Sequence, residues 1–496
     1  SLAISDARGF LHHAAGHYPV NHAGLAASSR LMGPEPNMKM TRRAFCAGLS
    51  AVPLARPTQA QDMALLTARA ATVQLAPDGY PATPVWSYKG TIPGPVIRAA
   101  QGSRLERRLK NTLEVPTSVH WHGIRIDNAM DGVAGLTQRA VPPGESFDYA
   151  FDLPDAGTYW YHAHTNSMEQ VARGLSGALI IEEATRPDVD RDEVLMIDDW
   201  LLDPDTGLFV DDFAAPMTRS HGGQIGNLVG VNGRYDYSVS ARQSERLRLR
   251  LINAANAQIF GLKLEGLTGW TVALDGMPLG TPEPVTDTLV LAPAQRMDLI
   301  VDVTAEEGET AGLLFAAADD TWRVLAEISV EGRAASVPRG APQPLPRNPR
   351  MEVVGVDAAP VLEMPLQGGA MRGLESAAFN GQKLTWQELV QQGQFWALAG
   401  QAGLGEAPFA TLSRGETARI RMTNDTIFPH AMHLHGMHFR TRKEDGSLGP
   451  LRDTVLVMPN EMTEIAFVAD NLGKWLLHCH MLGHAASGMT NWIMVA

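Results

Sequence analysis

One sequence unit occurs three times in this chain, and its recurrence constrains the fold more than any other feature. The copies span residues 102–123, 244–266 and 415–436, and each contains a short alternating run, a central Asn and a terminal Gly. From the Asn to the Gly there are 12, 13 and 12 residues (111 to 123, 253 to 266, 424 to 436). A unit that returns with nearly constant spacing indicates repeated structure. The chain is therefore predicted to contain three related domains.

The residues inside these units predict strands. In Arg246–Leu251 and Ala418–Met422, apolar residues alternate with arginines, which is typical of a strand with one buried and one exposed face. Gly, Pro, Asn and Asp separate such runs throughout the chain, and these residues favour turns. A length of 496 residues allows about three domains of ~150 residues. We predict an all-β fold of three consecutive β-sandwich or barrel domains.

Domain boundaries are predicted where this pattern of alternating runs and turn residues changes. We expect the first domain at residues 61–185, the second at 186–332 and the third at 351–496. Between the last two, residues 333–350 are rich in Pro and Arg without apolar periodicity, so we interpret them as a linker that runs over the surface.

The N-terminal residues are expected to lie outside the fold. Residues 1–37 lack periodicity and are interpreted as a non-native or unstructured extension. Residues 38–60 resemble a twin-arginine signal peptide, because Arg42 and Arg43 precede an apolar stretch that ends in small residues. That route exports folded proteins, so we expect a periplasmic or secreted protein.

Composition excludes several classes of partner. The net charge of −13 argues against binding to nucleic acid or to an anionic membrane surface. No apolar run after the signal approaches the ~20 residues of a membrane span. Only Cys46 and Cys479 are present, which rules out a disulfide framework. We expect a monomer that acts on small molecules.

Residues 478–489 carry the densest group of potential metal ligands. Cys479 lies between His478 and His480, with His484 five residues and Met489 ten residues after it. Thiolate, imidazole and thioether together suit copper, and a Cys-His-His set with a weak Met is the blue-copper electron-transfer site. In a strand, Cys479 would point to one face and its two neighbours to the other. Two metal sites would then share one short piece of backbone.

Paired histidines elsewhere complement this stretch. In each His-x-His pair, strand alternation places both imidazoles on one face. The first and third repeats carry such pairs just before the terminal Gly, whereas the second has Lys263 and Glu265 there, so the middle domain is predicted to lack metal ligands. Ala163 stands where Cys479 stands in the matching stretch of the third domain. Spacing alone yields ten candidate histidine ligands: His120, His122, His162, His164, His430, His433, His435, His478, His480 and His484.

These four motifs resemble those of the multicopper oxidases, specifically the three-domain bacterial laccase-like enzymes. The resemblance covers residues 62–496 and implies three cupredoxin-like Greek-key domains with four copper ions. It implies a type 1 copper bound by His430, Cys479, His484 and Met489. It implies a type 2 copper bound by His120 and His433. For the type 3 pair it implies His122, His162, His164, His435, His478 and His480.

The resemblance also suggests where protons and electrons enter. Asp131, in an Asp-Gly pair after the first motif, resembles the family's acidic residue near the type 2 copper and is predicted to relay protons; a solvated turn is the alternative. Many bacterial relatives have an acid after the type 1 His, where this chain has Ala485. Electrons would enter at the edge of His484. His438 is interpreted as a near-surface structural residue, with lining of the substrate entrance as the alternative.

The resemblance implies an oxidase that takes single electrons from phenols or aromatic amines at the type 1 copper and reduces O2 to two waters. Cuprous oxidation for periplasmic copper tolerance is the first alternative, although the methionines, among them Met351, Met364 and Met371, are too dispersed for a thioether cage. A copper nitrite reductase would not need eight further histidines. A non-enzymatic cupredoxin-fold or copper-sequestering protein remains the alternative from another class.

Overall fold

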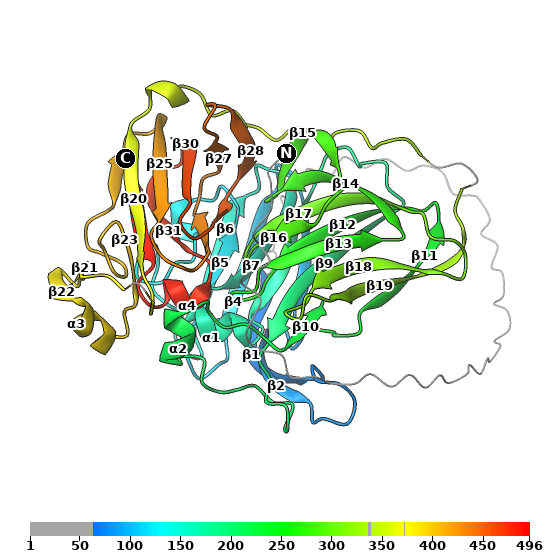
Figure 1. Ribbon diagram of the computed structural model, residues 1–496, viewed down its shortest axis with the longest axis horizontal. Helices are drawn as coiled ribbons and strands as arrows, with labels where there is room; N and C mark the ends of the chain where they lie inside the picture. The colour runs from blue at the N-terminus through cyan, green and yellow to red at the C-terminus, as the bar shows by residue number, and fades with distance from the viewer. Residues whose placement is uncertain (1–62, 336–338, 372) are drawn as a thin grey trace, which may run out of the picture.

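The computed structural model describes residues 63–335, 339–371 and 373–496 and is built almost entirely of strands (Figure 1). The expected extension and signal peptide, residues 1–60, lie outside the described residues. Among the described residues, no helix is long and apolar enough to cross a membrane. The prediction of an all-β fold is confirmed by three successive pairs of sheets.

The first pair contains two four-stranded sheets, in the orders β2-β1-β4-β6 and β3-β8-β7-β5. The helix α1 and the 3-10 helix η2 lie in its connections. The bounds of these elements are β1 Ala64–Val73, β2 Thr83–Tyr88, β3 Gly94–Ala100, β4 Arg104–Asn111, β5 Val119–His122, η2 Asn128–Met130, β6 Ser146–Asp152, β7 Gly157–Ala163, α1 Ser167–Ala172 and β8 Ser176–Glu182.

The second pair contains a six-stranded sheet, β10-β9-β12-β17-β14-β15, and a five-stranded sheet, β11-β19-β18-β13-β16. Its elements are β9 Arg191–Trp200, α2 Pro216–Ser220, β10 Leu228–Val231, β11 Ser238–Gln243, β12 Arg246–Asn253, β13 Phe260–Glu265, β14 Leu267–Leu274, β15 Met277–Pro284, β16 Leu289–Leu291, β17 Arg296–Val303, β18 Thr310–Ala316 and β19 Trp322–Arg333.

The third pair contains the sheets β23-β20-β25-β30-β27-β28 and β24-β32-β31-β26-β29, with a separate hairpin β21-β22. Its elements are η3 Val356–Ala358, β20 Val361–Gly368, β21 Ser376–Phe379, β22 Gln382–Thr385, α3 Trp386–Gln391, β23 Trp396–Leu398, β24 Ala410–Leu412, β25 Glu416–Asn424, β26 His430–Leu434, β27 Phe439–Arg442, β28 Leu448–Arg452, β29 Thr454–Val457, β30 Met462–Ala469, β31 Gly473–Cys479, α4 Leu482–Ala485 and β32 Thr490–Val495.

The recurring unit begins with the same strand in every pair of sheets. β4, β12 and β25 each pair in parallel with the first strand of their pair of sheets (β1, β9 and β20). Each also pairs antiparallel with a later strand (β6, β17 and β30). Each ends at the repeated Asn. The side-chain Nδ2 of Asn111, Asn253 and Asn424 donates to two backbone carbonyls, and the Oδ1 accepts from the amide two residues later. In all three copies, one buried side-chain amide thus forms hydrogen bonds with backbone groups of the turn that follows the strand.

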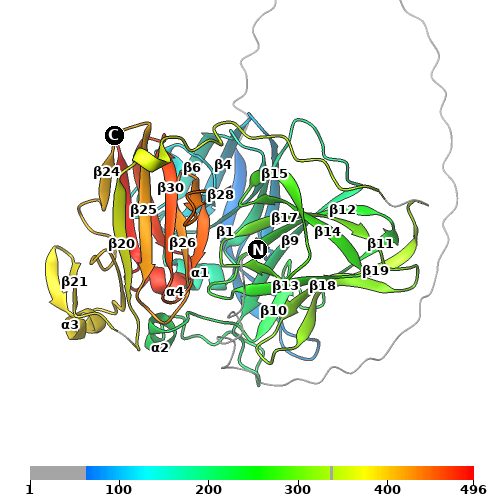
Figure 2. The same ribbon diagram turned by 45° about the horizontal axis from the view of Figure 1, so that its top comes forward.

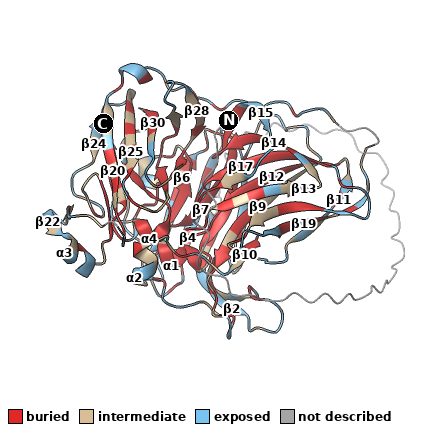
Figure 3. Cartoon of the chain, in the orientation of Figure 1, coloured by how far each residue is buried: buried red, intermediate tan, exposed pale blue. Residues whose placement is uncertain are grey.

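The prediction of half-buried strands holds for β25 and is wrong for β12. In β25 buried positions alternate with partly exposed ones, whereas all eight residues of β12 are buried. The arginine face of β12 is covered because it meets the first pair of sheets, and Arg250 Nη1 donates to Thr158 Oγ1 at 2.9 Å. Figure 3 shows β12 and β17 buried along their length. Buried carboxylates, including Asp298, pair with these arginines, as buried charges require.

Three short helices meet where the metal-ligand motifs of the chain converge. α1 follows the motif His162-Ala163-His164 of the first pair of sheets. α2 belongs to the segment after β9, and α4 contains His484. They lie side by side in both ribbon views (Figures 1 and 2). The stretch 339–350 contains no strand, but its Asn348 is buried and bonds the Ala156 amide and carbonyl. The extended connection therefore packs against the first pair of sheets.

Candidate metal centre

Eight of the predicted histidines converge between the first and third pairs of sheets, and we call them the histidine cluster. Strand pairing places them: His120 of β5 is opposite His162 of β7, and His433 of β26 is opposite His478 of β31. Each strand or its end then carries the second histidine of its pair. All are buried except His164, which is half-buried. The cluster comprises His120, His122, His162, His164, His433, His435, His478 and His480.

Hydrogen bonds to the Nδ1 atoms, at the outer edges of these rings, orient the rings so that their Nε2 atoms point into the cluster. The Nδ1 of His120 and of His433 lie 2.8 and 2.9 Å from the carbonyls of Asp131 and Asp453. A carbonyl only accepts, so each Nδ1 carries the proton and the Nε2 lone pair is free. Both Nε2 atoms are buried without a hydrogen-bond partner among the described residues. A buried acceptor of this kind requires a donor or a cation.

Further pairs of nitrogens face each other in the same way. The Nε2 atoms of His435 and His478 are 3.1 Å apart, and those of His480 and His162 are 3.4 Å apart. The Nδ1 atoms of His478 and His162 lie near the carbonyls of Cys479 and Ala163, which leaves their Nε2 atoms as acceptors. His435 Nδ1 likewise lies 3.0 Å from the Asp131 carboxylate, so the facing Nε2 atoms of His435 and His478 are both acceptors and would gain from a shared cation. This donor set fits several imidazole-bound metal ions.

Burial keeps the cluster in the protonation state that metal binding needs. Desolvation, followed by the neighbouring imidazoles, lowers the pKa of His162, His435 and His480 well below 6.5. The same causes lower the pKa of His164 to about 3. These imidazoles are therefore neutral at pH 7, and neutral imidazole is the ligand form.

The second group, which we call the cysteine cluster, consists of His430, Cys479, His484 and Met489. The Cys479 Sγ lies 3.7 Å from the Nδ1 of each histidine, and these two Nδ1 atoms are 3.1 Å apart. Each Nε2 is engaged on the outer side, by Thr426 Oγ1 at 2.8 Å for His430 and by the His221 carbonyl at 2.6 Å for His484. The two Nδ1 lone pairs and the sulfur thus converge on one point.

Met489, just before β32, lies next to Cys479 in the fold. It is fully buried, and its carbonyl accepts from the Cys479 amide at 3.1 Å. Burial raises the pKa of Cys479 to about 12, so the thiol needs a nearby cation to ionise. A metal ion supplies that charge and deprotonates a coordinating thiol. The residues present therefore fit a mixed thiolate–imidazole copper site.

The end of β31 connects the two clusters. Cys479 joins His430 and His484, whereas His478 on one side of it joins His164 and His435. His480 on the other side contacts His122 and His162. The structure thus brings together every histidine and the cysteine that spacing had singled out, and it divides them between two sites.

Asp131 lies against the histidine cluster rather than in a solvated turn. It follows η2 and is fully buried, with its carboxylate 3.0 Å from His435 Nδ1 and 3.3 Å from His120 Nδ1. The following Gly132 has φ +86°, and a Cβ there would come within 1.8 Å of the Val119 carbonyl. Only glycine lets the chain turn this close to β5.

Asp453 is a site residue that the sequence did not reveal. Its Oδ1 lies 3.3 Å from His122 Nε2 and 3.4 Å from His433 Nδ1. The guanidinium of Arg296, from β17 in the middle pair of sheets, binds both carboxylate oxygens of Asp453. Burial alone would raise the pKa of Asp453, but Arg296 and His122 hold it well below its usual value. No histidine or cysteine adjoins it in the sequence, so no local signal marked it.

Asp453 also orients His122 differently from His120 and His433. The carboxylate of Asp453 contacts the Nε2 of His122. The Nδ1 of His122 is therefore the ring nitrogen that is buried without a hydrogen-bond partner among the described residues. A carboxylate that fixes a histidine tautomer is a common feature around metal ligands. His438, expected near the surface, is buried beside Asp453, with its Nε2 3.7 Å from Oδ2. The expectation of a near-surface position was wrong, because the charged groups around His438 come from all three domains: Asp453, Arg125, Asp155 and Arg296.

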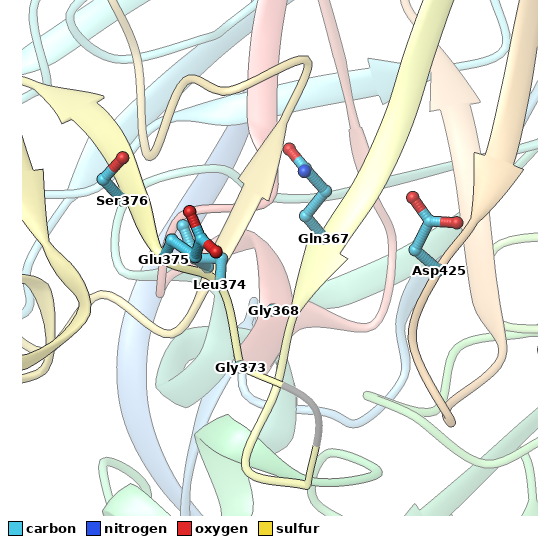
Figure 4. A pocket seen from close by; sticks show the side chains of 7 residues that line it. All are labelled: Gln367, Gly368, Gly373, Leu374, Glu375, Ser376 and Asp425. Atoms are coloured by element: carbon cyan, nitrogen blue, oxygen red, sulfur yellow. The ribbon is translucent and has the colours of Figure 1, made fainter.

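A polar pocket lies near the cysteine cluster but contains none of the predicted ligands. It is lined by Gln367, Gly368, Gly373, Leu374, Glu375, Ser376 and Asp425 (Figure 4). Asp425 precedes Thr426, whose hydroxyl contacts His430. The three candidate ligands of the cysteine cluster that lie together, His430, Cys479 and His484, are fully buried and do not line this pocket.

Comparison with known proteins identifies the class to which this fold and these clusters belong. Domain patterns described as multicopper oxidase match residues 69–186, 191–310 and 380–496. The chain belongs to the multicopper oxidase family, and its three pairs of sheets are cupredoxin-like domains, as predicted. Membership implies copper binding and an oxidoreductase activity that uses a small-molecule reductant and O2.

Individual relatives span nearly the whole described chain. Multicopper oxidase MmcO of Mycobacterium tuberculosis (strain ATCC 25618 / H37Rv) is 30% identical over 89% of this chain and 89% of its own length. Copper resistance protein A of Escherichia coli is 26% identical over 81% and 88%. The crystal structure of Lac15 from a marine microbial metagenome matches with a TM-score of 0.71 and 40% identity over 87% of this chain and 100% of that one. A multi-copper oxidase from Pseudomonas Thermotolerans gives 0.75 and 32% over 87% and 98%.

Proposed function

We propose that this protein is a laccase-like four-copper oxidase that takes single electrons from phenols or aromatic amines and reduces O2 to two waters. One observation carries the proposal: a single strand end, His478 to His480, contributes side chains to two separate clusters. A protein that only stored copper would gain nothing from this covalent connection. A protein that passes electrons between two sites would use this covalent connection as the route.

The ligand assignment is part of the proposal. The cysteine cluster would hold the type 1 copper through His430, Cys479 and His484, with Met489 as the weak axial ligand. The unpartnered Nε2 acceptors of His120 and His433 support a type 2 copper that these two residues would hold. The remaining histidines would hold the type 3 pair: His122, His162, His164, His435, His478 and His480.

When bound, copper supplies one-electron redox chemistry, and four ions together can hold the four electrons that O2 reduction requires. The chain's own residues do the rest. Cys479 provides a covalent route through its backbone to His478 and His480. The buried, neutral imidazoles supply lone pairs without competing protons. The enclosing domains exclude bulk water from the histidine cluster.

Asp131 is proposed to hold and pass protons at the histidine cluster. Its contacts with the Nδ1 atoms of His435 and His120 support this, because the buried carboxylate lies directly behind two candidate ligands and not in a solvated turn. A group within hydrogen-bond reach of the reacting site can serve as a general acid or base. Ala485 offers no second carboxyl near the type 1 side.

Cuprous oxidation is the second candidate function. Relatives named copper resistance protein A support it, and so does a neighbouring structure whose title describes a metallo-oxidase. Against a thioether cage, Met351 and Met364 are buried in the core, whereas Met371 is 67% exposed. We retain phenols and aromatic amines as the first candidates, and we propose an exported, monomeric enzyme.

The test is to load the protein fully with copper and follow O2 uptake with 2,6-dimethoxyphenol and with Cu(I) in parallel. We expect about four copper ions per chain, a blue absorbance and faster uptake with the phenol. Faster uptake with Cu(I) would select the second candidate. A fully loaded protein that consumes no O2 with either reductant would overturn the assignment as an oxidase.

A further inference from the structure

The edge of His484 is not available to a reductant. The residue is fully buried, and its Nε2 donates to the carbonyl of His221 at 2.6 Å. Trp396 packs on the ring with a centroid distance of 4.3 Å. The expectation that electrons enter directly at the edge of His484 therefore conflicts with the structure. Another group must make contact with the reductant.

The segment that covers His484 is anchored to the third domain. It contains α2 and belongs to the middle part of the sequence. The carbonyl of Arg219 accepts from Trp396 Nε1 at 2.7 Å and from Ser487 Oγ at 3.3 Å. The carbonyl of Ser220 accepts from the Ala370 amide at 2.9 Å. These bonds hold the His221 peptide against His484 in a fixed position.

The side chain of His221 extends from this cover towards solvent. The residue is partly exposed, and its ring meets the Phe428 ring edge-on at 5.8 Å. Its Nδ1 lies 2.9 Å from the Met217 carbonyl and therefore carries the proton in the neutral ring, which leaves Nε2 as an acceptor. The ring, its Cα and its own carbonyl form a continuous covalent path to the hydrogen bond with His484.

We propose that His221 is the residue through which electrons enter this oxidase. A phenolic reductant would donate its hydroxyl to His221 Nε2 and pack against His221 and Phe428. It would lose one electron, which the ring and backbone of His221 would carry to His484, one of the residues that would hold the type 1 copper, and it would release its proton to solvent. This inference rests on the proposed function and assigns the docking residue for its reductant.

The ring of His221 can be removed without removing the carbonyl that covers His484. In copper-loaded His221→Ala, we expect an unchanged blue absorbance and unchanged reoxidation by O2. Anaerobic bleaching of the blue colour by 2,6-dimethoxyphenol should slow by about tenfold or more. His221→Phe keeps an aromatic ring but lacks the acceptor, and should slow bleaching as well. Ile225→Ala is the matched control, because Ile225 lies on the same segment and is 49% exposed.

A binding measurement on copper-free protein is independent of turnover. Diethyl pyrocarbonate should modify His221, as followed by peptide mass spectrometry, and 2,6-dimethoxyphenol should protect it. Parent-like bleaching in both His221 variants, or modification of His221 that the phenol does not slow, would overturn the proposal. Failure of the proposed function itself would appear separately, as absent O2 uptake by the copper-loaded parent.

Discussion

Replacing Arg296 by Met should destabilise the protein more than the loss of any exposed ion pair. Arg296 and Asp453 have side-chain exposures of 0% and 1%, and Nη1 lies 2.9 Å from Oδ1. Arg296 also donates to the Thr158 carbonyl of the first domain at 3.2 Å. The pair thus ties all three domains together at the histidine cluster. Removal of the cation leaves a buried carboxylate that has lost its main partner.

The expected magnitude follows from this burial. Breaking a buried ion pair by removing one partner costs about 3–5 kcal/mol. Arg323→Met is the control, because Arg323 and Asp319 form a pair with side-chain exposures of 53% and 30%, for which about 0–1 kcal/mol is typical. A double variant, Arg296→Met with Asp453→Leu, should recover part of the loss, since no charge then remains buried without a partner.

The assay is equilibrium urea unfolding of copper-free protein, so that metal affinity does not contribute. The pH dependence gives a second check. The pKa of Asp453 is held well below its usual value, so its ionised form stabilises the parent above the unfolded value of about 4 and loses this effect as pH falls through the lowered folded pKa. Without Arg296 the same burial should raise the pKa of Asp453. The free energies of unfolding of the parent and of Arg296→Met should therefore become more similar as pH falls. An Arg296→Met loss no larger than that of Arg323→Met would refute the reasoning.

Three further substitutions test the metal centre. Cys479→Ser should abolish the blue colour and phenol oxidation while leaving three coppers bound, as metal analysis and a visible spectrum would show; a persistent blue band would contradict the assignment. Met489→Leu should leave the protein blue and raise the type 1 potential in a redox titration, because a weak axial donor is lost; a lower potential would argue against an axial role. Asp131→Asn should leave anaerobic bleaching nearly normal and delay recolouring by O2, increasingly so as pH rises, because Asn cannot exchange a proton. Equal rates in both phases at every pH would reduce Asp131 to a turn residue.

The sequence by itself determined the strand-rich class, the threefold repetition and the candidate ligands. The repeated Asn could be recognised because part of its bonding is local: in each copy its side chain bonds backbone groups of the turn that follows it. The histidine pairs could be recognised because a strand places alternate residues on one face wherever it lies. Such features depend on a few neighbouring residues and leave a pattern in the chain.

Only the tertiary structure decided what surrounds those ligands. Asp453 is 331 residues from His122 in the chain and contacts it because two domains meet there. Arg250 of β12 looked solvent-exposed and is buried because another domain covers that strand face. His221 covers His484 from 263 residues away. Contacts of this kind depend on how separate domains pack, and packing between domains follows from shape and charge complementarity that no local spacing records.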